Sequence, residues 1–98
     1  MTQQLVDKLK GEMEIATWKD LRTHVARDGI LLISPSLDLV EVGVAFAQDD
    51  KQRVQQWLEQ LLIKKPDTTF LNQMESKLDK RFSFLILQPF VLVQELLN

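Results

Sequence analysis

Hydrophobic residues dominate the last quarter of the chain, where residues 82–87 and 89–93 carry a single polar side chain between them. A strand over residues 82–88 would be apolar on both faces, which predicts either cover on both sides or contact with a partner on one side. Pro89 has no amide hydrogen for a sheet, so the strand is expected to bend, bulge or lie at an edge there. Residues 90–96 are then expected to continue it past the kink.

Two helices are predicted in the first third of the chain. Residues 3–13 place leucines and a methionine on one face at a spacing of four. A second helix is expected to begin after Thr17, which suits an N-cap, with Trp18 on its buried face. It is expected to end at Gly29, because glycine adopts the left-handed stop conformation without a Cβ clash.

The clearest helical pattern follows Asp49 and Asp50, either of which suits an N-cap. Hydrophobic residues then recur with helical spacing, at Val54, Trp57, Leu58, Leu61 and Leu62. This predicts an amphipathic helix that buries one face and ends before Pro66. A weaker helix is indicated after residues 67–68 by the spacing of Phe70, Met74 and Leu78.

The middle of the chain is the hardest to assign. Residues 30–33 form an apolar run of strand length, and Pro35 ends it. Residues 39–47 alternate β-branched with other residues, and Gly43 among three valines favours a strand, with a helix as the rival. The favoured reading joins the two runs in a hairpin across residues 34–38.

These elements together predict an α+β fold. We expect a single small domain over residues 1–98, with an antiparallel sheet of about three strands and about four helices packed against it.

Composition and charge narrow the class of protein. The chain is 45% hydrophobic and 27% charged, as in globular domains, and its net charge of −2 predicts no face for nucleic acid. It has no cysteine, which removes disulfides and thiolate metal sites and suits a reducing compartment. The apolar segment 82–97 is shorter than the roughly 20 residues that span a bilayer, and the N-terminus lacks a secretory signal. A cytoplasmic protein without membrane contact is therefore expected.

Candidates for catalysis are few. His24 is the only histidine, and no motif places a nucleophile beside it. The acids Asp38, Glu41, Asp49 and Asp50 could hold Mg²⁺ or Ca²⁺, but the calcium-loop pattern is missing and helix capping is a sufficient role for the last two. The sequence predicts no catalytic residue, no cofactor and no metal, so an enzyme is less expected than a binding protein.

Four residues are candidates for a binding surface or an interface. Gln88 and Gln94 are amides in an apolar run, and a buried amide without a partner costs on the order of 1–3 kcal/mol. They would line a pocket, pair across a subunit interface, or face solvent at the kinked end of the strand. Phe90 lies between them, and Trp57 belongs to the residue type enriched at interface hot spots, although core packing is its default role.

Four segments carry a resemblance to a known family: residues 37–39, 42–45, 54–57 and, most distinctively, 88–94, which read Gln-Pro-Phe-Val-Leu-Val-Gln. Because of these segments, residues 18–95 of the chain resemble a family of small bacterial proteins known only as a domain of unknown function. The resemblance implies a bacterial origin. It implies no activity, cofactor, partner or site residue.

Two functions remain on these grounds. The first is a small non-enzymatic interaction module, either a homodimer or a protein that binds another protein, because an apolar sheet edge invites a further strand. The alternative is a small ligand-binding or catalytic domain with a pocket near Gln88 and His24, because polar groups among apolar walls make ligand sites.

Overall fold

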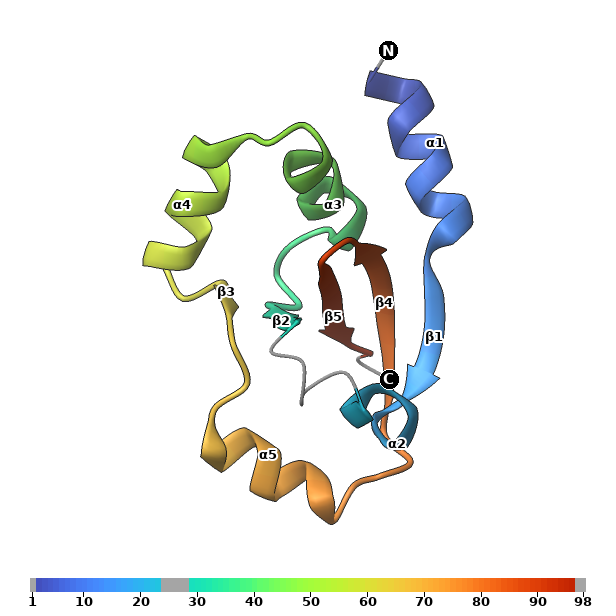
Figure 1. Ribbon diagram of the computed structural model, residues 1–98, viewed down its shortest axis with the longest axis vertical. Coiled ribbons are helices and arrows are strands. Elements are labelled where there is room, and N and C mark those ends of the chain that lie inside the picture. Colours follow the sequence, from blue (N-terminus) through green and yellow to red (C-terminus); the bar gives the residue numbers. More distant parts are fainter. Residues whose placement is uncertain (1, 24–28, 97–98) are drawn as a thin grey trace.

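The computed structural model describes residues 2–23 and 29–96, and within them the chain forms five helices and five strands (Figure 1). The helices are α1 (Thr2–Glu12), α2 (Trp18–Leu21), α3 (Leu39–Ala47), α4 (Lys51–Glu59) and α5 (Thr68–Glu75). The strands are β1 (Glu14–Thr17), β2 (Ile30–Ile33), β3 (Ile63–Lys64), β4 (Arg81–Leu87) and β5 (Phe90–Glu95).

The strands form one mixed sheet in the order β1-β4-β5-β2-β3. Strands β5 and β2 are parallel, and the other neighbouring pairs are antiparallel. The α+β class is confirmed, but the sheet has more strands than expected and is not purely antiparallel. The additional strands β1 and β3 are only four and two residues long, which is too short for a periodic signal in the sequence.

The apolar C-terminal segment forms a hairpin. Leu87 pairs with Phe90, and Gln88 and Pro89, joined by a cis peptide bond, form the turn between them. The expectation that residues 90–96 continue the first strand is therefore wrong. The chain reverses, and β4 and β5 satisfy each other's backbone groups in an antiparallel ladder.

Each central strand divides its side chains between two hydrophobic cores, because successive residues of a strand point to opposite faces. In β5, Leu92 belongs to the first core, whereas Val91 and Val93 belong to the second. In β4, Leu85 belongs to the first core and Phe82 to the second. Of the two alternatives from the sequence, cover on both sides holds for most of β4, but Ile86 near its end is 52% exposed.

The first core lies against α1 and α3, and α3 corrects the sequence interpretation of residues 39–47. These residues form a helix, not a strand, and the predicted hairpin across residues 34–38 does not exist. Six of the nine residues of α3 are buried, so its valines pack on several sides at once. A β carbon on Gly43 would lie only 3.1 Å from Leu85 Cδ1 and 3.2 Å from Leu9 Cδ1. Gly43 is therefore there for close approach of the helix, not for a strand.

The second core lies against α2 and α5. Its centre is Trp18, which is 1% exposed and packs its ring edge-to-face on Phe70, with ring centroids 5.4 Å apart. Phe82 of β4 contacts the same ring at 5.7 Å. Helix α2 ends at Leu21, well before Gly29, and the rest of the predicted second helix falls largely on residues 24–28, outside the described residues.

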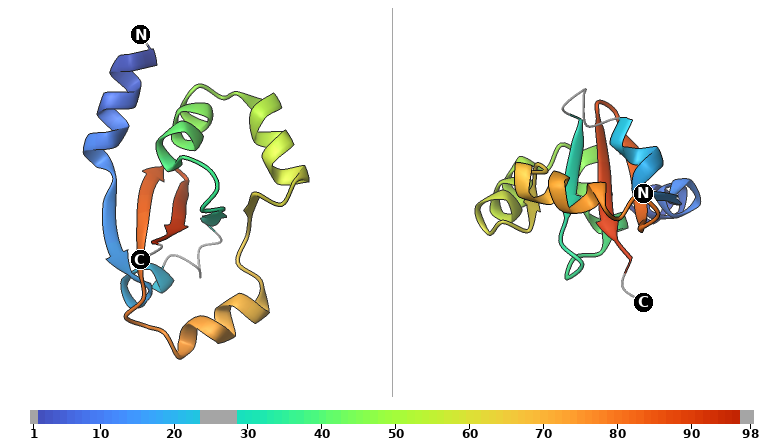
Figure 2. Two further views of the ribbon diagram at one scale, coloured as in Figure 1. Left: turned by 180° about the vertical axis from the view of Figure 1, so that it is seen from behind. Right: turned by 90° about the horizontal axis from the view of Figure 1, so that it is seen from below.

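Aspartates begin three of the helices. The side chains of Asp38, Asp50 and Asp67 accept hydrogen bonds from backbone amides in the first turns of α3, α4 and α5. Figure 2 shows α1 and α4 at opposite sides of the molecule in both views. Within residues 2–23 and 29–96, no helix is long and apolar enough to cross a membrane.

Candidate functional site

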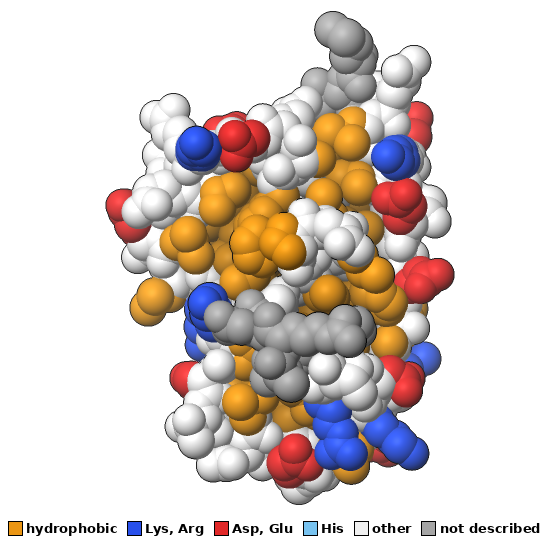
Figure 3. All heavy atoms as spheres, in the orientation of Figure 1, with side chains coloured by type: hydrophobic (Ala, Val, Ile, Leu, Met, Phe, Trp, Pro, Cys, Tyr) orange, Lys and Arg blue, Asp and Glu red, His pale blue; other side chains and the backbone are white. Residues whose placement is uncertain are grey.

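A groove of about 740 Å³ lies between α3, α4 and the sheet. We call it the α4 groove. Its apolar lining comes from both helices, from β2 and from the β4–β5 hairpin: Leu31, Ala45, Phe46, Ala47, Val54, Leu58, Leu87 and Phe90. Its polar lining consists of Asp49, Asp50, Lys51, Gln55, Lys65 and Gln88. Figure 3 shows hydrophobic side chains gathered on the visible face over this region.

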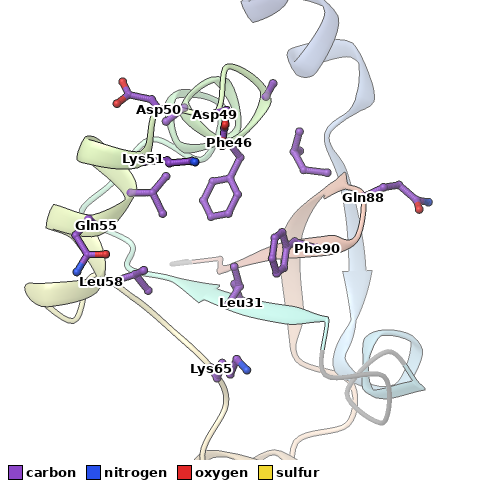
Figure 4. A pocket seen from close by; sticks show the side chains of 14 residues that line it. Leu31, Phe46, Asp49, Asp50, Lys51, Gln55, Leu58, Lys65, Gln88 and Phe90 are labelled. Atoms are coloured by element: carbon purple, nitrogen blue, oxygen red, sulfur yellow. The ribbon is translucent and has the colours of Figure 1, made fainter.

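An aromatic pair forms the floor of the groove. Phe46 points from α3 toward Phe90 at the start of β5, and Leu31 of β2 lies between Phe90 and Leu58 of α4 (Figure 4). The two rings meet edge-to-face, with centroids 5.8 Å apart and planes at 72°, an arrangement that aromatic quadrupoles favour. Both rings are only partly buried, so the floor is accessible from the groove.

Helix α4 forms one wall, and none of its residues Lys51–Glu59 is buried. This corrects the sequence interpretation, which predicted a helix here but extended it past Glu59 to include Leu61 and Leu62, and expected its apolar face to lie in the core. Val54 is half-buried, and Leu58 is 39% exposed and points across the groove toward Leu31 (Figure 4). The helix therefore presents an apolar face that the chain itself covers only in part.

The junction between α3 and α4 explains why α4 stands away from the sheet. Asp49 adopts a left-handed φ of 54° just after α3. The amide of Asp50 donates to the carbonyl of Ala45 at 2.9 Å, and the amide of Asp49 donates to that of Phe46 at 3.2 Å. These bonds form a Schellman motif, which ends one helix and fixes the direction of the chain. Asp50 then caps α4 through the amide of Arg53.

Polar contacts on the side chain of Arg53 hold α4 beside α3. Its guanidinium forms an ion pair with Glu41 of α3. It also lies 4.9 Å from the centre of the Trp57 ring, in cation–π contact. Trp57 is half-buried and packs against the first core. It is absent from the lining of the groove, so its role is to anchor α4.

The residues proposed from the sequence have different places. Phe90 lies in the floor of the groove, and Gln88 lies at its rim, exposed and pointing away from Phe90 (Figure 4). Gln94 is not in the groove, because its side-chain amide donates to backbone carbonyls of the loop before α3. His24 lies outside the described residues.

The acids singled out in the sequence serve separate roles. Asp38 and Asp50 are caps, Asp49 is the left-handed residue after α3, and Glu41 pairs with Arg53. Within the described part of the chain, no group of three or more acids and histidines is close enough to hold a metal ion. The groove is therefore an apolar hollow with a polar rim, and the described residues around it include neither hydroxyl nor imidazole groups.

Sequence reasoning missed Phe46 and Leu31 as groove residues. Phe46 follows Leu39 and Val42 at the i+7 and i+4 positions, which is helical spacing and a signal that could have placed it. No comparable signal exists for Leu31, because its position depends on the pairing of β2 with β5.

Comparison with known proteins places the chain in a family. The family described as "Protein of unknown function (DUF2288)" matches residues 4–95. The chain belongs to this family. It is also similar to the structure described as "NMR solution structure of PA1075 from Pseudomonas Aeruginosa", with 30% identity and a TM-score of 0.80, over 97% of this chain and 87% of that one. No curated protein matches the chain. The resemblance to uncharacterised bacterial proteins is thus confirmed.

Proposed function

We propose that the chain is a small non-enzymatic interaction module, and that the α4 groove binds apolar side chains of a protein partner. The observation that carries the proposal is that α4 has a hydrophobic face with no buried residue, opposite an accessible Phe46–Phe90 floor. An amphipathic helix of a globular protein usually buries its apolar face. A contiguous apolar surface with a polar rim is typical of an interaction site.

The chemistry of the lining favours binding over catalysis. The polar residues at the rim are carboxylates, amines and amides. Asp50 is already engaged as the cap of α4. Such groups orient a partner by hydrogen bonds and charge, whereas the apolar floor supplies the contact area.

Selection of peptides on phage tests this proposal. A random peptide library is selected against the immobilised protein, and the binders are measured by fluorescence anisotropy on the wild-type chain and on Leu58→Glu. We expect the binders to carry apolar anchor residues and to lose at least tenfold in affinity on the variant, because a carboxylate then lies in the apolar wall. Ile15→Glu is the matched control, because Ile15 is an exposed hydrophobic residue of β1 outside the groove. Equal binding to the wild type and to Leu58→Glu would overturn the proposal, and so would the absence of any selected binder.

A second candidate is the binding of a small molecule in the same groove. Its support is the volume of about 740 Å³, which falls within the range of about 300–1,000 Å³ for ligand sites. A thermal-shift screen with metals and metabolites tests it, because a ligand that binds the native state raises its apparent melting temperature. A hit that shifts the wild type and Ile15→Glu, but not Leu58→Glu, would support a ligand site in the groove.

The proposal also covers the cellular compartment of the protein and the residues that make up the module. We place the module in the bacterial cytoplasm, where the lack of cysteine in the chain suits the reducing conditions. We take residues 1–98 to act as one domain, which the single sheet with two cores supports.

A further inference from the structure

Residues 51–65, which contain α4, the turn after it and β3, run along one side of the molecule (Figure 1). All of them are described, and among them only Ile63 is buried. Ile63 belongs to the first core and pairs with Ile33 of β2. Helix α3 has the same length as α4 but buries six of its nine residues. Because local stability follows buried apolar area, α4 is held less firmly than α3.

Two hollows adjoin this segment. Leu58 and Lys65 line the α4 groove. Leu61, Leu62 and Lys64 line a second hollow of about 290 Å³, whose other walls come from β2, α5 and the paired ends of β4 and β5. Side chains that face a hollow lack neighbouring atoms there and lose the attraction that close packing supplies. The segment is therefore packed less closely than either core.

Few contacts attach α4 itself. The ion pair of Arg53 with Glu41 is formed by side chains that are 40% and 58% exposed, and exposed ion pairs contribute little to stability. Val54 and Trp57 are only half-buried. Trp57, which packs against the first core, is thus the main apolar anchor of the helix.

Left-handed residues lie at both ends of α4. Asp49 precedes the helix with a φ of 54°, and Leu61 follows it with a φ of 60°. The amide of Leu62 donates to the carbonyl of Trp57 at 2.9 Å, as in a Schellman motif, whose left-handed position is normally glycine. Leucine disfavours this conformation. Unfolding of the turn would therefore release backbone strain at Leu61.

Detachment of α4 would also unfold it. The helix has nine residues, whereas isolated helices shorter than about 12–15 residues are marginal in water. Once α4 leaves the first core, nothing keeps it helical. Its amides would then exchange with solvent, which makes such an opening measurable.

We propose that residues 51–62 form a flap that detaches and unfolds as one unit while the sheet and both cores stay folded. Asp49 at the end of α3 and Ile63 in the first core bound the flap. The open state lacks one wall of the α4 groove, so a local equilibrium controls access to the Phe46–Phe90 floor. Mobile walls of binding sites are commonly drawn from the least stable parts of a fold. This inference goes beyond the proposed function, because it concerns the wall of the groove and not its occupant.

Amide hydrogen exchange of the wild-type chain, followed residue by residue by NMR, tests the flap. The amides of residues 54–62 are expected to exchange at least about a hundredfold faster than those of β4 and β5, after correction for intrinsic rates. Their exchange is also expected to depend less steeply on urea, because opening the flap exposes less surface than global unfolding. Helix α3 is the matched comparison within the chain. Equal rates and equal urea dependence in α3 and α4 would overturn the inference.

Two variants separate opening of the flap from global unfolding. Trp57→Ala is expected to speed exchange of residues 54–62 at least about tenfold, because the flap loses its anchor. Val91→Ala is the control, because Val91 is 7% exposed in the second core, which stays intact when the flap opens. It is expected to speed exchange in β4 and β5 by about tenfold and to leave that of the flap unchanged. An equal acceleration of flap and strands by Val91→Ala would overturn the inference, and so would unchanged flap exchange in Trp57→Ala.

These outcomes are independent of the proposed function, which the peptide selection tests. Exchange of α4 at the rate of the sheet would overturn the flap, and the groove would remain a binding site if selected peptides bind it. Absence of any selected binder would remove the proposed function, whereas fast local exchange of α4 would still support the flap.

Discussion

The side chain of Gln94 connects the end of β5 to the loop that precedes α3. Its Nε2 donates a hydrogen bond of 2.6 Å to the carbonyl oxygen of Leu37, and another of 2.9 Å to that of Ser34. Gln94 also faces Ile33 in the parallel pairing of β5 with β2. One partly buried amide thus ties together a strand, a loop and the start of a helix. The loop it holds leads directly into α3, which carries Phe46 in the floor of the α4 groove.

Replacing Gln94 by Glu should lower the free energy of unfolding by about 1–3 kcal/mol. The carboxylate has no hydrogens to donate at neutral pH, so the carbonyls of Leu37 and Ser34 would lose their donor and face a negative charge. Chemical denaturation measures the change. Gln88→Glu makes the same substitution at an exposed turn residue, and should change the free energy by less than about 0.5 kcal/mol. Equal effects at both sites would contradict the structural role of Gln94.

The backbone at Leu61 predicts an unusual order of stability among its variants. Leu61→Gly and Leu61→Ala both remove the exposed side chain, but only alanine keeps the Cβ that the left-handed conformation disfavours. The glycine variant should therefore be about 0.5–1 kcal/mol more stable than the alanine variant. Glycine loses more conformational freedom on folding than alanine does, but this offsets only part of what it gains by avoiding the Cβ strain. Thermal melts of the two variants at one low concentration compare them. An alanine variant at least as stable as the glycine variant would argue against a left-handed Leu61.

The two tryptophans should differ in their contribution to stability. Trp18 is 1% exposed and packs on Phe70 and Phe82, so Trp18→Ala should cost about 3–5 kcal/mol, enough to unfold a domain of ordinary stability. Trp57 is only half-buried, so Trp57→Ala should cost about 1–3 kcal/mol, including its contact with Arg53. Circular dichroism and urea titration of both variants measure the difference. If Trp57→Ala lost more free energy of unfolding than Trp18→Ala, Trp57 would be the core residue and Trp18 the less buried one, contrary to the structure.

Two helical glycines should respond in different ways to a methyl group. Nothing lies within 4 Å of a β carbon placed on Gly11 in α1, whereas one on Gly43 meets Leu85 and Leu9 at 3.1 and 3.2 Å. Gly11→Ala should stabilise the protein by about 0.5–1 kcal/mol through helix propensity. Gly43→Ala should be at least about 1 kcal/mol less favourable, because the side chains of the two leucines must shift. Denaturation midpoints of the two variants measure the contrast, and equal gains would mean that α3 is not closely packed.

Much of the local structure could be predicted because its causes are local. The pattern of residues 3–13 predicted α1, and the hydrophobic spacing that starts at Val54 predicted α4, although the expected helix included Leu61 and Leu62, beyond its end at Glu59. Strand β2 matches the apolar run 30–33 residue for residue. Caps and hydrophobic periodicity act within a few residues, so they can be read without the fold.

The incorrect predictions concern segments whose secondary structure depends on contacts with residues far away in the sequence. The alternating valines of residues 39–47 are compatible with a strand, but α3 buries them against α1 and the sheet, and tertiary packing overrides weak intrinsic preference. The reversal at Pro89 likewise depends on the pairing of β5 with both β4 and β2. The sequence named Phe90 and Gln88 as candidate binding or interface residues, and both line the groove. It could not name Phe46 or Leu31, which come to the groove from separate elements.

The sequence by itself determined the α+β class, most of the helices and the apolar character of the two central strands, because chain-local hydrogen bonding and side-chain periodicity control these features. Only the tertiary structure decided which hydrophobic faces are covered. Burial of a face depends on what the rest of the chain places against it. In this protein the junction at Asp49 and Asp50 leads into α4, whose Leu58 is 39% exposed, and the left-handed residue Leu61 after α4 is 73% exposed.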